Sequence, residues 1–329
     1  MAILVLGGAG YIGSHMVDLL VQKKEDVVVV DNLSYGHRQA VPESVPFYQG
    51  DVRDHDFLEQ VFTQHDIEAV FHFCAYIQVP ESVVKPNDYF DNNVVGLISL
   101  INVMKNHQVK KLIFSSSAAV YGTPERVPIK EDDAKDPINP YGLTKLMMEQ
   151  IMRWDGAAYE MQWLAFRYFN VAGARLDGNL GEDHRPETHL IPIVLQAALG
   201  QREHVEMCGN DYQTRDGYNV RDYVHVLDLV QAHYFGLEYL RQGGQSDYFN
   251  IGSKQGFTVK EIVEAARRVT GVNIKAIDAP RRGGDPDSLV ADSTKIRTDL
   301  GWQSPHTDID TIISSAWNWL QKHPNGYSK

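Results

Sequence analysis

The sequence contains few cysteines, no long apolar run and no excess of basic residues. Only Cys74 and Cys208 occur in 329 residues, which excludes a disulfide framework and indicates a reducing compartment. No apolar run approaches the roughly 20 residues that a membrane span requires. We expect no signal peptide, because Ala2–Leu6 is preceded by no basic leader or cleavage site. The net charge of −12 argues against a nucleic-acid partner. These features predict a cytoplasmic protein.

The first half of the chain alternates short β-branched runs with longer amphipathic stretches. The runs predict strands at Ala2–Leu6, Val27–Asp31, Phe47–Gly50, Ala69–Phe73, Lys111–Ser115 and Trp163–Phe169. The stretches predict helices at Ile12–Lys23, Asp54–Gln64, Asp88–Asn106 and Pro140–Tyr159. Several strands are almost wholly apolar, as strands buried on both faces are. This pattern predicts an α/β fold with a doubly wound parallel (Rossmann) sheet and ligands beyond the C-terminal strand ends.

The composition changes after about Asn170. Gly, Asp, Arg and Pro become frequent at Gly173–Pro186 and Pro280–Pro286. Helical patterns recur at His189–Leu199, Leu227–Arg241, Val259–Thr270 and Ile309–His323. We therefore expect two domains, 1–170 and a smaller α/β lobe at 171–329, with segments such as 220–250 returning to the sheet. From Pro324 on we expect a frayed tail.

A glycine-rich loop follows the first predicted strand and opens the first predicted helix. Gly7, Gly10 and Gly13 fit a dinucleotide-binding turn, in which glycines allow close approach of a pyrophosphate to a helix N-terminus. Asp31 ends the second strand, where a carboxylate accepts hydrogen bonds from ribose hydroxyls and repels a 2′-phosphate. This favours NAD over NADP, and Arg38 is the residue that would favour NADP.

Asp51 ends the third predicted strand and has two interpretations. Its carboxylate could accept a hydrogen bond from the adenine amino group. It could equally be the N-cap of the helix that follows. The sequence leaves both interpretations open.

A serine, a tyrosine and a lysine form the candidate catalytic group. Ser117 closes the fifth strand, and Tyr141 and Lys145 lie four residues apart on one face of a predicted helix. A free tyrosine has a pKa of about 10, and a nearby ammonium group can lower it by about 1–3 units. The positive nicotinamide ring of NAD⁺ would add to this effect, so we predict that Tyr141 is a general base near neutral pH and that Ser117 holds or relays the proton. In isolation, a Tyr-x-x-x-Lys motif is best interpreted as two surface residues of a helix. Here the glycine loop, Asp31 and the serine at a strand end favour the catalytic interpretation.

These motifs together resemble the extended short-chain dehydrogenase/reductase family over nearly the whole chain. Within that family the chain is similar to the UDP-glucose 4-epimerases. The segments that carry this likeness are His72–Phe73, Tyr89–Asn93, Ser115–Gly122, Arg167–Asn170, Asp211–Gly217, Arg221–Val226, Ala279–Asp285, Trp317–Trp319 and His323–Tyr327.

The resemblance implies an NAD-dependent isomerase of galactose metabolism that interconverts UDP-galactose and UDP-glucose. Residues 1–170 would bind NAD and residues 171–329 the UDP-sugar, in a homodimer built on the Asp88–Asn106 and Pro140–Tyr159 helices. The implied cofactor contacts are Gly7, Gly10, Tyr11, Ile12, Gly13, Asp31, Asn32, Asp51, Val52, Phe73, Asn92, Ser115, Tyr141, Lys145 and Tyr168. The implied substrate contacts are Ser117, Tyr141, Asn170, His189, Leu190, Arg221, Arg282 and Asp285.

Some of these substrate contacts keep a second interpretation. Arg221 and Arg282 could clamp a diphosphate or form surface ion pairs. Asp285 could bind ribose hydroxyls or pair with an arginine. His189 stands where the family has a second uridine-contacting Asn.

The chain departs from the family pattern at a few other positions. Ile77 stands where some members have a cofactor-contacting Lys, and Ala119 where many have Thr. Leu289 replaces a bulky Tyr beside the sugar 2-substituent, which predicts additional activity on UDP-GlcNAc and UDP-GalNAc. The histidines show no metal-ligand spacing, so no metal is expected.

Two other functions are weighed against epimerisation. A nucleotide-sugar 4,6-dehydratase or decarboxylase would need an acidic residue where Ala118 and Ala119 stand. A catalytically silent NAD-sensing protein would be expected to lack the Tyr or the Lys of the active helix, and both are present.

Overall fold

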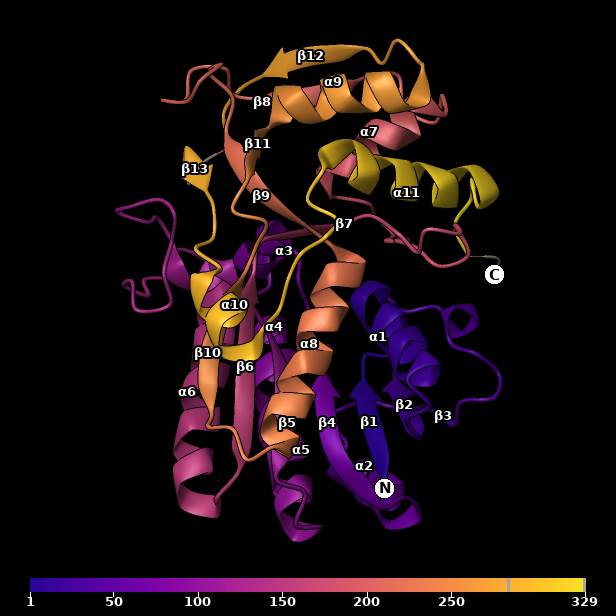
Figure 1. Cartoon of the computed structure of the whole chain (residues 1–329), viewed down its shortest axis with the longest axis vertical. Helices are drawn as coiled ribbons and strands as arrows, with labels where there is room; N and C mark the ends of the chain where they lie inside the picture. The colour runs from indigo at the N-terminus through magenta and orange to yellow at the C-terminus, as the bar shows by residue number, and fades with distance from the viewer. Residues whose placement is uncertain (283–284, 328–329) are drawn as a thin grey trace.

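The central element of the protein is a seven-stranded parallel sheet. A computed structural model describes residues 1–282 and 285–327, and within them the strand order is β10-β6-β5-β4-β1-β2-β3. All neighbouring strands run parallel. The strands are β1 (Ala2–Leu6), β2 (Val27–Asp31), β3 (Phe47–Gln49), β4 (Ile67–His72), β5 (Lys111–Ser117), β6 (Gln162–Tyr168) and β10 (Asp247–Ile251). The predicted α/β fold with a doubly wound parallel sheet is confirmed (Figure 1).

Apolar side chains bury this sheet on both faces. In β2, Val27 and Val29 enter the core on one face, while Val28 and Val30 enter the core on the other, as the two-residue period of a strand requires. Helices α1 (Tyr11–Gln22), α8 (Val226–Arg241) and α10 (Thr294–Leu300) cover the first face. Helices α2 (His55–Gln64), α5 (Gly96–Asn106) and α6 (Pro140–Tyr159) cover the second.

The strand order reverses between β1 and β4. From β1 the chain winds outward to β2 and β3, and from β4 it winds the other way to β5, β6 and β10. Loops leaving the C-terminal ends of β1 and β4 therefore diverge and leave a crevice there. Because the strands are parallel, the glycine loop, Asp31 and Ser117 all lie at the C-terminal ends of their strands, beside this crevice.

The region predicted as one helix at Asp88–Asn106 is divided in the structure. It contains α4 (Pro86–Tyr89), a π-helical stretch (Phe90–Val95) and α5, and a further helix, α3 (Val79–Val84), precedes it. The π-helical stretch buries the side chains of Asn92 and Asn93. Asn93 accepts a hydrogen bond from Tyr76 N at 2.8 Å and donates to Thr144 Oγ1 at 3.0 Å. The irregular turn thus ties the loop after β4 to α6.

A second lobe lies beyond the C-terminal edge of the sheet, at the top of Figure 1. Strand β9 (Val220–His225) pairs with three neighbours, β7 (Asn170–Ala172), β11 (Gly256–Thr258) and β13 (Ser288–Leu289). Strand β8 (Val205–Cys208) pairs with β12 (Ala276–Ala279). Helices α7 (Leu190–Ala198), α9 (Val259–Thr270) and α11 (Ile309–Lys322) supply the separate core of this lobe. Asn170, which follows the predicted strand Trp163–Phe169, begins β7.

The chain after Pro324 is packed, so the predicted frayed tail is wrong as far as residue 327. The Tyr327 ring is buried against Trp319, with the ring centres 4.7 Å apart. Its backbone N–H donates to Asp183 Oδ2 at 2.9 Å. Within the described part of the chain, the helices are all too short or too polar to cross a bilayer.

Candidate active site

The glycine loop between β1 and α1 has the geometry of a phosphate cradle. A Cβ on Gly13 would lie 2.0 Å from Gly7 O, and one on Gly7 would lie 2.7 Å from Cys74 N, so both positions exclude a side chain. Gly10 is the N-cap of α1 and provides no side-chain cap. The first N–H groups of α1 are therefore free of a side-chain cap and can bind an anion.

Asp31 lies where a ribose would meet the second strand. Its carboxylate is buried and accepts hydrogen bonds from Ala9 N at 2.9 Å and Leu33 N at 2.7 Å. Burial raises the pKa of Asp31. Arg38 is engaged elsewhere, because it donates to Val41 O at 2.8 Å and stacks over the Phe47 ring at 4.7 Å. The arrangement fits NAD, and the residue that favoured NADP is occupied.

Asp51 is not a helix N-cap, so that interpretation is wrong. The N-cap of α2 is Asp54, which accepts from Phe57 N at 3.0 Å. Asp51 instead accepts a hydrogen bond from Asn32 Nδ2 at 3.2 Å and pairs with Arg53 at 2.7 Å. Hydrogen bonds from Arg53 lower the pKa of Asp51 to about 2. The carboxylate is therefore ionised beside Asn32.

A hollow at the switch point gathers much of the predicted cofactor set. Its lining includes Gly7, Gly10, Asp31, Asn32, Val52, Phe73 and Asn92. Gly36 and Tyr76 line the same hollow and were not expected from the sequence. A Cβ on Gly36 would lie 2.9 Å from Ala9 C, so this position has no room for a side chain. The glycine five residues after Asp31 was therefore the feature of the sequence that could have indicated this part of the hollow. Ile12 and Tyr11 lie in the first turn of α1, and the Tyr11 hydroxyl donates to Gly173 O at 2.6 Å.

The structure brings the predicted catalytic side chains together at the start of α6. Asn139 caps this helix by accepting from Gly142 N at 2.8 Å, and proline follows at the first helical position. A Cβ on Gly142 would lie 2.5 Å from Ala119 O. This glycine therefore lets α6 approach the turn after β5, and the Ser117 hydroxyl is near enough to the Tyr141 phenol to lower its pKa in part.

The electrostatics of Tyr141 differ from the expectation. Burial raises the pKa of Tyr141, and the nearby Ser117 hydroxyl lowers it only in part. Lys145 Nζ donates to Ser115 O at 2.8 Å and lies 5.9 Å from the centre of the Tyr141 ring. Burial lowers the pKa of Lys145 to about 8. Lys145 by itself therefore does not bring the pKa of Tyr141 below its usual value, and the predicted base relies also on the positive nicotinamide ring.

Ser115 and Tyr168 lie beside the catalytic group at the ends of β5 and β6. Their hydroxyl groups are hydrogen-bonded to each other. Burial raises the pKa of Tyr168 beyond its usual range. Tyr168 is therefore a neutral hydroxyl, and we assign it no part in proton transfer.

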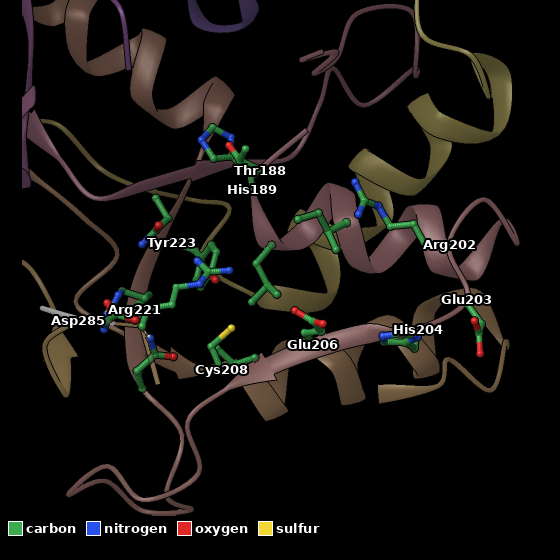
Figure 2. A pocket seen from close by; sticks show the side chains of 16 residues that line it. Thr188, His189, Arg202, Glu203, His204, Glu206, Cys208, Arg221, Tyr223 and Asp285 are labelled. Atoms are coloured by element: carbon green, nitrogen blue, oxygen red, sulfur yellow. Dashed lines mark hydrogen bonds and ion pairs between the residues drawn. The ribbon is translucent and has the colours of Figure 1, made fainter. Parts of the chain in front are cut away.

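A cavity of about 580 Å³ in the second lobe gathers the predicted substrate residues (Figure 2). Its lining includes Asn170, His189, Leu190, Arg221, Arg282 and Asp285. Ser117 and Tyr141 are not part of this lining, so the cavity would hold the part of a ligand that does not react. Tyr223, Asn219 and Cys208 also line it and were not expected from the sequence.

Several polar groups of the cavity have protein partners in the structure, whereas Asn219 Oδ1 and His204 Nδ1 are buried without one among the described residues. Arg221 pairs with Asp285, and Asn219 Nδ2 also donates to Asp285 at 2.8 Å. Asn170 Nδ2 donates to Asp222 O at 3.1 Å. Arg221 and Asp285 therefore form the ion pair that was the second interpretation of both residues. Residues 283 and 284 of the Ala279–Asp285 motif lie outside the described residues.

The fold and the site together define an NAD-binding enzyme of the Rossmann class with a Ser-Tyr-Lys group. Residues 3–252 match the model of the NAD dependent epimerase/dehydratase family. The chain belongs to this family.

Known proteins resemble the chain over its full length. A UDP-glucose 4-epimerase of Streptococcus mutans is 56% identical over 329 residues, covering 99% of both chains. A crystal structure of a UDP-glucose 4-epimerase has a TM-score of 0.99 at 54% identity, covering 100% of both chains. The Bifidobacterium longum UDP-glucose 4-epimerase in complex with NAD+ and UDP has a TM-score of 0.94 at 39% identity, covering 99% of this chain and 100% of that one. The resemblance drawn from the sequence motifs is confirmed.

Proposed function

We propose that this protein is an NAD-dependent isomerase that interconverts UDP-galactose and UDP-glucose. The observation that carries the proposal is the placement of Ser117 at the end of β5 with Tyr141 and buried Lys145 at the start of α6, on a chain with a phosphate-binding glycine loop. The 56% identity to a UDP-glucose 4-epimerase over 329 residues supports the same reaction.

The chemistry follows from the position of the reacting bond. The hexose C4–H is not adjacent to a carbonyl group, so it cannot be removed as a proton. Bound NAD supplies a reversible hydride acceptor for C4, which makes oxidation to a flat 4-keto sugar available. Rotation of that sugar exposes its opposite face and inverts C4 when the oxidation is reversed.

The side chains of this chain would manage the proton. Tyr141 takes the proton of the C4 hydroxyl during oxidation and returns it afterwards, while Ser117 holds the reacting oxygen. Because burial raises the pKa of Tyr141, the phenolate needs positive charge nearby. Lys145 provides one such charge when its amine, whose pKa burial lowers to about 8, is protonated.

The cavity residues would hold the nucleotide and leave the sugar free to turn. Arg221 and Arg282 would bind the diphosphate with charge-assisted hydrogen bonds. Binding exchanges the Arg221–Asp285 pair for a phosphate, and Asp285 then becomes available to the ribose hydroxyls. Asn170, His189 and Leu190 complete the lining. Strong contacts to UDP and weak contacts to the hexose divide the binding energy as sugar rotation requires.

The test is incubation of the purified protein with UDP-galactose and no added NAD. We expect UDP-glucose to form and the NAD to remain bound, because each cycle regenerates it. Release of water or carbon dioxide would instead establish a dehydratase or decarboxylase. Binding of NAD without any sugar turnover would establish a sensing protein.

We also propose that the chain accepts UDP-GlcNAc and UDP-GalNAc. Leu289 is half-buried in β13 and packs against the cluster of Ala118, Val120, Tyr121 and Ile129 that follows the catalytic serine. A leucine there fills less space than the tyrosine of other members, so a 2-acetamido group has more room.

We propose a homodimer built on α5, α6 and their symmetry mates. Apolar side chains on these helices, and that of Val95 directly before α5, are exposed in the single chain; those on the helices are Ile98, Leu143, Trp154 and Tyr159. Leu143 and Trp154 are eleven residues apart and therefore lie on one face of α6. Light scattering should give twice the chain mass of 37.1 kDa, and Trp154→Glu should give the single-chain mass.

We further propose that the enzyme is cytoplasmic and that NAD binds in 1–170 and the UDP-sugar in 171–329. Two free cysteines, Cys74 and Cys208, support a reducing compartment. Strand β10 belongs to the central sheet and helix α8 packs on that sheet. Part of the segment 220–250 therefore joins the first domain, although it lies within 171–329. A reporter fusion localised outside the cytoplasm would contradict the first statement.

A further inference from the structure

A group of four metal-ligand side chains lies in the segment before α7, away from Ser117 and Tyr141. Glu182, His184, Glu187 and His189 each offer one ligand atom, and these atoms all lie within 4.8 Å of one another. The ring centres of His184 and His189 are 5.2 Å apart. Two imidazoles and two carboxylates therefore face a common point.

The carboxylates in this cluster are buried. The side chains of Glu182 and Glu187 are 6% and 4% exposed. His184 Nδ1 lies 3.1 Å from Glu182 Oε1 and 4.0 Å from Glu187 Oε2, and His189 Nδ1 contacts Glu182 Oε1. Glu187 Oε1 accepts from Thr188 N at 2.7 Å and His189 N at 2.8 Å, which orients its second oxygen toward His184. Backbone contacts thus fix the carboxylate in place.

The cluster needs positive charge. Among the ion pairs of the described residues, Glu182 and Glu187 pair with histidines and with no lysine or arginine. Arg185, in the same segment, is engaged by Asp183, Asn325 O and Tyr327 O. Two buried carboxylates without a fixed cation are costly. Either protonated histidines or a bound cation must compensate them.

We propose that Glu182, His184, Glu187 and His189 bind a divalent transition-metal ion of the zinc class. Two imidazole nitrogens and two carboxylate oxygens suit Zn²⁺ in a tetrahedral site, whereas Mg²⁺ and Ca²⁺ prefer oxygen ligands alone. Metal–ligand bonds of about 2.1 Å place tetrahedral ligand atoms about 3.4 Å apart. Side-chain movement on the order of 1 Å closes the observed cluster to that size.

The position of the site indicates what the ion does. His189 is the N-cap residue of α7 and lines the substrate cavity. The His184 ring packs edge-on against Tyr11 in the first turn of α1, with centres 6.3 Å apart. The ion would therefore fasten the rim of the cavity beside the dinucleotide loop. Four protein ligands leave no open position, so the role is structural.

The ion-free alternative is a protonated His189 held by Glu182. His189 Nδ1 contacts Glu182 Oε1, which is the geometry of such a pair. A metal must displace that proton, since only neutral imidazole is a ligand. Binding of the metal should therefore weaken as the pH falls, which the experiment can include.

The experiment uses the full chain purified without a polyhistidine tag. Its metal content is measured, the metal is removed with a chelator, and ZnCl₂ is titrated back at pH 7.5 and pH 6.0 while the unfolding midpoint is followed. MgCl₂ is titrated in parallel. His184→Ala and Glu187→Gln each remove one ligand. His107→Ala is the matched control, because His107 also bonds a carboxylate, Glu59, at 2.7 Å on another surface.

We expect one Zn²⁺ per chain and a midpoint rise of about 5 °C at a hundredfold excess over Kd. The rise should be smaller at pH 6.0 and absent with MgCl₂. Both ligand variants should lose the stoichiometric ion, and the His107 variant should keep it. Absence of stoichiometric Zn²⁺ uptake by the wild-type chain would overturn the proposal. This test does not depend on whether the variants fold. Unchanged binding in both ligand variants would overturn it as well.

Discussion

Replacing Tyr141 by Phe removes the hydroxyl that is proposed to exchange the C4 proton. The phenol lies near the Ser117 hydroxyl, while Lys145 Nζ donates to Ser115 O at 2.8 Å. Only the serine hydroxyl then remains beside the reacting oxygen. Loss of a general base costs about 10²–10⁴-fold in rate, or about 3–5 kcal/mol of transition-state stabilisation. We expect a kcat decrease near the upper end, because Ser117 has no base of its own.

The assay is UDP-galactose conversion followed at several substrate concentrations. Since the proposed UDP contacts lie in the cavity of Arg221, KM should change less than about threefold, and bound NAD should be retained. Loss of one hydrogen bond should lower the free energy of unfolding by about 1 kcal/mol. Tyr48→Phe is the control, because its hydroxyl donates to Gln64 Oε1 at 2.9 Å, where α2 ends. Wild-type kcat in the Tyr141 variant would refute the proton-transfer argument.

Three further predictions concern specificity, stability and pH. Leu289→Tyr should reduce turnover of UDP-GlcNAc at least tenfold and leave UDP-galactose turnover nearly unchanged in parallel assays; equal losses on both substrates would contradict it. Glu149→Ala should lower the free energy of unfolding by about 3–5 kcal/mol in urea titrations, because it leaves the buried Arg167 without its bonds of 2.8 and 2.6 Å; a loss below about 1 kcal/mol would contradict this. Burial lowers the pKa of four buried histidines in the folded protein. As the pH falls below about 6.5, these histidines are therefore protonated in the unfolded chain before they are protonated in the folded one. The free energy of unfolding that they contribute above about pH 6.5 should be lost as the pH falls toward about 4. Each histidine adds up to about 1.4 kcal/mol per pH unit; a flat profile between pH 7 and 5 would contradict the assignment to His15, His72, His225 and His233.

The parallel sheet was predictable because its strands are buried on both faces. Val27–Asp31 is apolar until its last residue, so its position needed no tertiary information. Strands β8 and β12 were missed, because Glu206 and Asp278 interrupt their apolar pattern and they pair only with each other. The packed end of the chain was also missed, because only the fold brings Tyr327 beside Asp183.

Placement of the catalytic group was predictable because it follows from strand ends and helix periodicity. Ser117 closes β5, and Tyr141 and Lys145 share one face of α6. The acidity of Tyr141 was not predictable, since it depends on the surrounding desolvation. The Glu182–His189 cluster was not expected either, because its spacing fits no regular element and the loop conformation alone brings its ligand atoms together.

The most direct test of the account is the fate of the C4 hydrogen. UDP-galactose carrying deuterium at C4 is incubated with the enzyme in ordinary water, and the recovered UDP-glucose is analysed by mass spectrometry and NMR. Hydride removal and return within one active site predicts that the deuterium stays at C4 of the product. Its replacement by solvent hydrogen would contradict transient oxidation at C4, whatever role Tyr141 has.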